Sequence, residues 1–347
     1  MYKSAVHHEN SKYSNNQAQK RELKMDKKVL VTGGAGFIGS TLVKRLLEQK
    51  YAVTVLDNLN TGLAENLPAD DHLKLIDGDV RDFNLVSKIV RNHPCVVHLA
   101  AHAFIPFSYE MPLEVAEVNA MGSISVFKAS VDNKVSRIVH VSSSEVYGSA
   151  QYTPMDEKHP LQPYSTYSVA KAAADMWAQT FFWEHEMPVV ILRPFNTYGP
   201  RESLPYFIPE MIRQCLKEPE IRVGDLSTKR DFTYVVDTAD AMVKALETES
   251  IEGEIINIGT TQTHTMKDIL TLIQRETNAD KKEVVADKGR FRPKDLNVLI
   301  TDNKKAMRLL KWTPTTSYEE GIRKTIRWYL DNGQRWGYEE HGWKWRY

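Results

Sequence analysis

The segment that decides the fold is Thr32-Gly33-Gly34-Ala35-Gly36-Phe37-Ile38-Gly39. It follows the β-branched run Val29–Thr32 and precedes Ser40–Lys50, in which apolar residues recur at helical spacing. Glycines after a strand let the backbone turn tightly and approach a pyrophosphate, whose charge the N-terminus of the following helix stabilises. The segment therefore predicts a dinucleotide site, and its candidate contacts are Gly33, Gly36, Phe37, Ile38 and Gly39.

An acidic residue indicates which dinucleotide is bound. Asp57 follows the second apolar run, Ala52–Leu56, and stands 18 residues after Gly39. A carboxylate at this position accepts hydrogen bonds from a ribose 2′-hydroxyl and repels a 2′-phosphate, so we expect NAD rather than NADP. Asp79 and Val80 follow the third run and are expected beside the adenine, where the carboxylate of Asp79 can accept from the exocyclic amine.

The rest of the first half repeats the same pattern of strand and helix. Apolar runs at Leu73–Ile76, Cys95–Leu99, Val135–Val141 and Val189–Leu192 alternate with segments of helical periodicity. This alternation predicts a doubly wound α/β fold, in which helices cover both faces of a parallel (Rossmann) sheet.

The second half is less regular. Prolines interrupt it after Gly199, and the helices expected at Phe207–Leu216 and Met266–Thr277 have no regular strand partners. We therefore predict a polar N-terminal extension over 1–26, an NAD-binding domain over 27–198 and, over 199–347, mostly a smaller, irregular α/β substrate lobe. A strand near 254–258 is expected to return to the main sheet.

Composition excludes several classes of protein. The 347 residues carry 45 Lys+Arg and 45 Asp+Glu, and this balance argues against binding to nucleic acid or to a membrane surface. Only two cysteines are present, so neither a disulfide framework nor a metal site is expected, and a reducing compartment fits. No apolar run approaches the ~18 residues of a membrane span, and the first residues lack the apolar core of a signal peptide. These features predict a cytoplasmic protein.

A tyrosine and a lysine provide the candidate chemistry. Tyr167 and Lys171 are four residues apart and therefore share a helical face. Ser143, Ser144 and Glu145 directly follow the fifth expected strand, at the sheet edge where α/β folds bind ligands. A tyrosine that acts as a base needs a pKa well below its usual value of about 10. Lys171 and a positive nicotinamide ring would lower it, and Ser143 would relay the proton of a substrate alcohol.

Several segments together resemble the extended short-chain dehydrogenase/reductase family that modifies nucleotide sugars. They are TGGAGFIGS, DNLNTG, HLAA, SSSEVYG, YSVAK, RPFNTYGPR and RDFTYV, in matching order between Val29 and about Thr325. The resemblance implies an NAD-dependent enzyme that oxidises the sugar at C4 and later returns the hydride. It also implies cofactor contacts at Asn58, Leu99, Ala100, Ala101, Tyr167, Lys171 and Pro194.

The residue at 145 separates the reactions of this family. A 4,6-dehydratase needs a base for the C5 proton and an acid for the leaving C6 hydroxyl, and hydride then returns to C6. Epimerases that resemble this family usually have a small or neutral residue there, so Glu145 favours a dehydratase. Ser143-Ser144-Glu145 departs from the Thr-Asp-Glu of glucose-type dehydratases, which leaves the identity of the acid open. The stretch from Tyr147 to Leu161 resembles dehydratases of N-acetylglucosamine-type substrates.

Three alternatives stay open beside a UDP-hexose 4,6-dehydratase. They are a 4-epimerase, a UDP-glucuronate decarboxylase and, less favoured because Tyr167 and Lys171 are both present, a non-catalytic NAD-binding protein.

The resemblance also implies contacts to the substrate and to a second chain. The expected substrate contacts are Ser144, Asn196, Arg230 and Arg292, of which the two arginines suit a diphosphate. A homodimer is expected through a four-helix interface, built from helices around 114–132 and 167–184. Those helices carry Val118, Phe127, Met176, Trp177 and Phe181.

Overall fold

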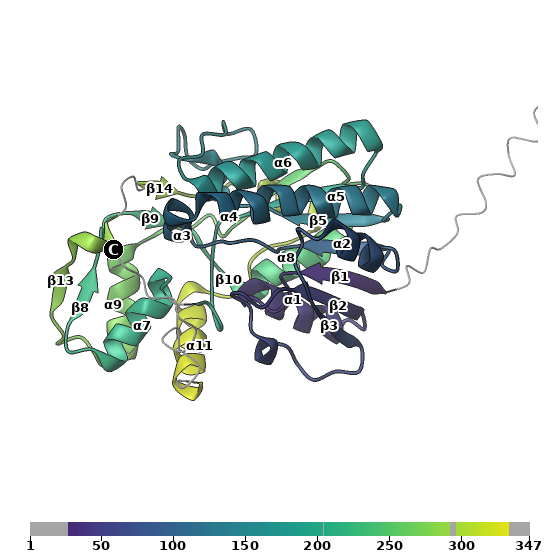
Figure 1. Ribbon diagram of the computed structural model, residues 1–347. Helices are drawn as coiled ribbons and strands as arrows, with labels where there is room; N and C mark the ends of the chain where they lie inside the picture. The colour runs from purple at the N-terminus through teal and green to yellow at the C-terminus, as the bar shows by residue number, and fades with distance from the viewer. Residues whose placement is uncertain (1–26, 204, 292–295, 333–347) are drawn as a thin grey trace, which may run out of the picture.

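The computed structural model describes residues 27–203, 205–291 and 296–332 (Figure 1). The predicted extension over 1–26 and the candidate Arg292 lie outside the described residues. None of the described helices is both long enough and apolar enough to cross a membrane.

A seven-stranded parallel sheet forms the centre of the molecule, in the order β11-β6-β5-β4-β1-β2-β3. This is the doubly wound α/β fold that the sequence predicts. The strands are β1 Lys28–Thr32, β2 Ala52–Asp57, β3 Leu73–Asp77, β4 Cys95–His98, β5 Arg137–Val141, β6 Val189–Pro194 and β11 Ile255–Ile258. The fifth strand begins two residues later than predicted, because Val135 still belongs to the helix end, where its N–H donates to Ser130 O.

Alternate residues of each strand pack against helices on opposite faces of the sheet. From β1, Val29 and Val31 contact a cluster with α1 (Phe37–Glu48) and α8 (Val235–Glu247), whereas Leu30 joins the cluster on the other face. That second cluster contains α2 (Phe83–Val90), α5 (Gly122–Asp132) and α6 (Thr166–His185). Figure 1 shows α5 and α6 on one side of the sheet and α1 on the other. Because both faces are buried, the strands read as continuous apolar runs.

The second half forms a third apolar cluster beside the sheet, around α7 (Phe207–Lys217), α9 (Met266–Glu276) and α11 (Tyr318–Asp331). Short strands complete it: β7 Asn196–Tyr198 with β10 Phe232–Tyr234, β8 Ile221–Val223 with β13 Val284–Ala286, and β9 Lys229–Arg230 with β12 His264–Thr265 and β14 Val298–Leu299. The helix α10 (Lys304–Leu310) instead packs its Ala306 and Leu310 into the cluster with α1 and α8. The expectation that α7 and α9 lack strand partners is therefore wrong, since β8 follows α7 and β13 follows α9. Strands of three residues are too short to show a periodic pattern.

The helix expected around 114–132 is interrupted. It consists of α4 (Pro112–Ala116), a π-helical turn over Glu117–Met121 and α5, and the short α3 (Ile105–Glu110) precedes it. Of the residues expected at an interface, Val118, Phe127 and Phe181 are instead buried in the core against the sheet. Met176 and Trp177 are 59% and 43% exposed.

Candidate active site

The loops at the carboxyl edge of the main sheet carry the predicted site residues. β2 and β3 lie on one side of β1, and β4, β5 and β6 lie on the other. Open α/β sheets bind ligands at such a switch point, because the loops on its two sides diverge and leave a crevice. The loop after β1 carries the glycine segment, the loop after β4 carries Leu99–Ala101, and the loop after β5 carries Ser142–Glu145.

Three of the four glycines in the glycine segment are needed for different reasons, and the fourth, Gly34, packs against Val55. Gly33 has a φ of +72°, and a Cβ there would lie 2.7 Å from the backbone nitrogen of Ala100. At Gly39 a Cβ would lie 2.1 Å from the carbonyl oxygen of Gly33, so this glycine lets α1 pack closely on the loop. At Gly36, the residue before α1, the nearest atom would be 3.4 Å away. Only Gly36 therefore leaves room on its Cβ side, as a pyrophosphate at the helix N-terminus requires.

The Asp57 carboxylate lies against the same loop. Its Oδ2 accepts from the N–H of Ala35 (2.9 Å) and its Oδ1 from the N–H of Leu59 (3.0 Å). Burial raises the pKa of this carboxyl, and the two N–H donors counteract part of that effect. The side chain is thus held beside the glycine loop, and its role as a ribose acceptor stays a prediction. These residues fit a dinucleotide.

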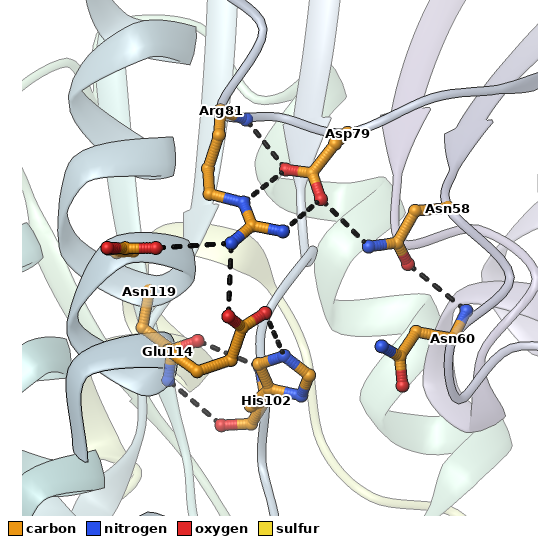
Figure 2. Close-up of polar contacts among 8 residues, drawn as sticks. Asn58, Asn60, Asp79, Arg81, His102, Glu114 and Asn119 are labelled. Atoms are coloured by element: carbon orange, nitrogen blue, oxygen red, sulfur yellow. Dashed lines mark hydrogen bonds and ion pairs between the residues drawn. The ribbon is translucent and has the colours of Figure 1, made fainter. Parts of the chain in front are cut away.

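The predicted adenine-binding residue, Asp79, is held by protein groups (Figure 2). Its carboxylate accepts from the backbone N–H, Nε and Nη2 of Arg81 at 2.9, 2.9 and 2.8 Å, and from Nδ2 of Asn58 at 3.0 Å. The Arg81 side chain thereby lowers the pKa of Asp79 to about 2. The carboxylate is therefore ionised at neutral pH, and an adenine amine would share it with Arg81 and Asn58.

The same network continues into the loop after β4. Arg81 Nη1 lies 3.2 Å from Glu114 Oε2 on α4, and Glu114 Oε1 lies 3.5 Å from Nε2 of His102. The amide of Asn119, in the π-helical turn, donates to the carbonyl oxygen of His102 and accepts from its N–H. Figure 2 shows how these contacts link the strand-end carboxylate to the helices. Sequence analysis missed Asn119, since nothing in the sequence places its amide against His102.

Tyr167, Ser143 and Lys171 come together as predicted by the motif spacing. The hydroxyl of Ser165 caps α6 by accepting from the N–H of Ser168, which places Tyr167 in the first turn and Lys171 one turn later. The Tyr167 hydroxyl is hydrogen-bonded to Ser143, whose Oγ also accepts from the N–H of Glu145 at 3.2 Å. Nζ of Lys171 donates to the carbonyl oxygen of Val141 at 2.9 Å.

The protein groups do not prepare Tyr167 as a base by themselves. Burial raises the pKa of Tyr167 to about 12, and the carboxylates of Glu145 and Asp175 act in the same direction against the hydrogen bond from Ser143. Burial also lowers the pKa of Lys171 to about 8, while Asp175 acts to raise it. The shift of Tyr167 is opposite to the one that a base requires. Further positive charge would therefore be needed beside Tyr167 for it to act as a base.

The two candidate residues after Ser143 follow it directly in the chain. Ser144 and Glu145 belong to a short 3₁₀ helix, Ser144–Tyr147, in which Ser144 is buried and Glu145 is half-buried. The carboxylate of Glu145 is close enough to influence the pKa of Tyr167.

The expected substrate contacts of the second half are only partly brought to this edge. Asn196 begins β7, and its Oδ1 is buried without a hydrogen-bond partner among the described residues. Arg230, on β9, is 5% exposed, and its Nη1 donates to the carbonyl oxygens of Leu296 (2.6 Å) and Lys229 (3.0 Å). These contacts hold the Arg230 guanidinium inside the second half, and its role towards a diphosphate stays a prediction.

A glycine loop at a switch point, a ribose acceptor and a buried Tyr–Ser–Lys group define a dinucleotide-dependent enzyme of the extended short-chain dehydrogenase/reductase class. The family model described as GDP-mannose 4,6-dehydratase matches residues 30–325, and the chain belongs to this family. Proteins of this family are NAD-dependent enzymes that act on nucleotide sugars.

Similar proteins are divided among three reactions. The structure of a dTDP-glucose 4,6-dehydratase from Streptomyces venezuelae, crystallised with NAD, superposes with a TM-score of 0.84 at 31% identity and covers 89% of this chain and 99% of that one. A UDP-N-acetylglucosamine 4-epimerase from Methanobrevibacter ruminantium gives a TM-score of 0.82 at 31% identity, covering 88% and 99%. A UDP-N-acetyl-α-D-glucosaminuronate decarboxylase from Bacillus cytotoxicus is 30% identical over 88% of this chain and 99% of its own. The chain is therefore an NDP-sugar dehydratase, epimerase or decarboxylase.

Proposed function

We propose that the protein is an NAD-dependent NDP-sugar 4,6-dehydratase whose substrate is a UDP-linked hexose such as UDP-N-acetylglucosamine. The observation that carries the proposal is the half-buried carboxylate of Glu145, placed two residues after Ser143 and beside the Tyr167 hydroxyl. A 4-epimerase has no step that needs a carboxylate there, whereas a dehydratase must remove the C5 proton and help the C6 hydroxyl to leave as water.

The residues of this chain then have separate roles. NAD supplies the hydride acceptor and donor, and its positive ring supplies the charge that Tyr167 lacks. Tyr167 removes the O4 proton through Ser143, so that a ketone forms at C4. Glu145 removes the C5 proton, which the neighbouring ketone makes acidic, and that proton is available for the departing C6 hydroxyl. Lys171, anchored on Val141, would orient the cofactor next to Tyr167.

A decarboxylase is the second candidate, since one similar protein has that activity and the Ser-Ser-Glu sequence also resembles decarboxylases. There the C4 ketone would stabilise the charge left at C5 when the C6 carboxylate departs as carbon dioxide, and the C5 proton would not have to be removed by a base at 145.

Mass spectrometry of products distinguishes these reactions. The purified protein is incubated with NAD and, separately, UDP-N-acetylglucosamine, UDP-glucose, UDP-glucuronate, GDP-mannose and dTDP-glucose. Loss of one water from a hexose supports the proposal and identifies the substrate. Loss of carbon dioxide from the glucuronate overturns it in favour of the decarboxylase. An unchanged mass with a new chromatographic peak means epimerisation, which would leave Glu145 without a chemical role.

A further inference from the structure

A cluster of charged and titratable side chains is sealed in protein behind Tyr167 and Lys171. Asp175 lies one helical turn after Lys171 on α6 and is fully buried. Its Oδ2 accepts from Nε of Arg193, on β6, at 2.8 Å, and the arginine is 2% exposed. Its Oδ1 lies 3.5 Å from Nε2 of His140, on β5. Sequence analysis gave Asp175 no role, although its i+4 spacing from Lys171 is visible in the sequence.

The charges of this cluster do not cancel. Burial lowers the pKa of His140 and of His98, whose rings are stacked 5.6 Å apart, so both are neutral at pH 7. The Asp175 carboxylate contacts Arg193 directly and also acts on Lys171, which lies one helical turn before it on α6. A buried ion is costly unless a counter-ion accompanies it, so this one buried anion affects both nearby cations strongly.

Other polar and charged side chains surround the cluster. Nη1 of Arg193 donates to the Tyr147 hydroxyl (2.9 Å), which donates to Oδ1 of Asn257 (2.7 Å). The carboxylate of Glu157 raises the pKa of Tyr147, and the carboxylate of Glu145 raises the pKa of Tyr167. Asp175 is thus the carboxylate that acts on both Tyr167 and Lys171 from inside the protein.

We propose that Asp175 is a positioning residue whose buried carboxylate, paired with Arg193 and one helical turn from Lys171, sets how readily the Tyr167–Lys171 pair gives up a proton. The proposal rests on the roles proposed above for Tyr167 and Lys171. The Asp175 charge keeps Lys171 protonated at its buried position, and Arg193 limits this effect by holding the same carboxylate. Without Arg193 the carboxylate would act on Lys171 and Tyr167 at full strength.

Substituting Asp175 and substituting Arg193 must shift the titration of the Tyr167–Lys171 pair in opposite directions. Asp175→Asn removes a negative charge, which makes both Tyr167 and Lys171 lose a proton more readily. Arg193→Met removes a positive charge and makes the loss harder. For unit charges about 6 Å apart at an effective dielectric constant near 20, each shift would be on the order of one to two pH units. Because the two groups titrate together, the shift belongs to the pair.

Absorbance titration of the phenolate in the NAD-bound protein tests this without any sugar substrate. Each protein is compared with its Tyr167→Phe counterpart, so that the other tyrosines cancel. We expect the Tyr167 titration to move to lower pH in Asp175→Asn and to higher pH in Arg193→Met. Asp175→Glu and Arg193→Lys keep the charges, and Tyr147→Phe removes only a hydrogen bond, so all three should titrate close to the unmodified protein.

Equal titration of Asp175→Asn and Arg193→Met, or shifts in the same direction, would overturn the proposal. A merely structural role would lower the melting temperature of both variants without separating their titrations. If Asp175→Asn does not fold, comparing Arg193→Met with Arg193→Lys still tests the proposal. Only Arg193→Met should move the Tyr167 titration to higher pH. Failure of every sugar to react would refute the proposed function and leave this test intact.

Discussion

Two glycines of the same loop, Gly36 and Gly39, should respond differently to the same substitution. A Cβ at Gly39 would lie 2.1 Å from Gly33 O and 2.8 Å from Gly34 Cα, and both are backbone atoms that cannot rotate away. A Cβ at Gly36 would meet its nearest atom at 3.4 Å, and the backbone there (φ −75°, ψ −177°) is accessible to alanine. Gly39→Ala should therefore damage the fold, and Gly36→Ala should damage cofactor binding.

The magnitudes follow from these distances. Forcing a methyl group into the backbone contact at Gly39 should cost about 1–3 kcal/mol or more. Alanine would gain about 1 kcal/mol in helix propensity over glycine, so the overlap costs about 1 kcal/mol more than the net loss of stability. At Gly36 the loss of stability should stay below ~1 kcal/mol, as for an altered helix cap. The new methyl group would stand where the pyrophosphate approaches, and a loss of about 1.4–2.8 kcal/mol of binding is a 10- to 100-fold weaker Kd.

Thermal melting with and without NAD, together with calorimetric titration of NAD, checks both expectations. Gly36→Ala should melt close to the unmodified protein in the absence of NAD but gain much less from added NAD. Gly39→Ala should melt at a lower temperature even without NAD. Unchanged NAD affinity in Gly36→Ala would refute the placement of the pyrophosphate over this residue, and an unchanged melting temperature in Gly39→Ala would refute the packing argument.

Three further expectations concern chemistry, assembly and pH. Tyr167→Phe should slow nicotinamide reduction by at least ~100-fold, whereas Glu145→Gln should still reduce the nicotinamide but release little dehydrated product; undiminished product from Glu145→Gln would remove Glu145 from the mechanism. Met176 and Trp183 are 59% and 70% exposed and lie seven residues apart on α6, so Met176→Glu with Trp183→Glu should convert a homodimer to a monomer in light scattering, an expectation that fails if the unmodified chain is already monomeric. The pKa of Glu202 is raised well above its usual range by burial, and its Oε2 has no partner among the described residues. The folded protein therefore binds a proton that the unfolded chain has released, and stability falls as the pH rises above the unfolded pKa of about 4.3. Glu202→Gln should remove this dependence, so that its melting temperature exceeds that of the unmodified protein increasingly as the pH rises from about 4.3 towards the raised pKa of the folded state; parallel melting curves would contradict the assignment.

The sheet could be predicted from the sequence because its strands are buried on both faces. Val29–Thr32 reads as a continuous apolar run for that reason, and the glycine segment fixes the register between strand and helix. The small strands of the second half could not be predicted. β9 contains two residues, and its pairing with β12 and β14 depends on contacts between segments more than 30 residues apart.

The candidate site divides in the same way. Tyr167, Ser143 and Asp57 could be found because each belongs to a local motif whose spacing determines its direction. The contacts of other candidate residues could not be predicted from the sequence. The ion pair between Asp79 and Arg81, two residues apart, and the burial of Arg230 against the carbonyl of Leu296, 66 residues away, depend on side-chain positions that no sequence motif contains.

The contacts of Arg81 also explain why the site suits NAD. A 2′-phosphate needs a cation that is not already neutralised, and the arginine beside Asp79 does not meet this condition. Arg81 lies within 3.3 Å of carboxylate oxygens of Asp79, Glu114 and Glu117, so its charge is opposed by three acids. Asp57 adds a further carboxylate beside the glycine loop. Converting the site to accept NADP would therefore require a cation that is not already paired with acids, in addition to replacing Asp57.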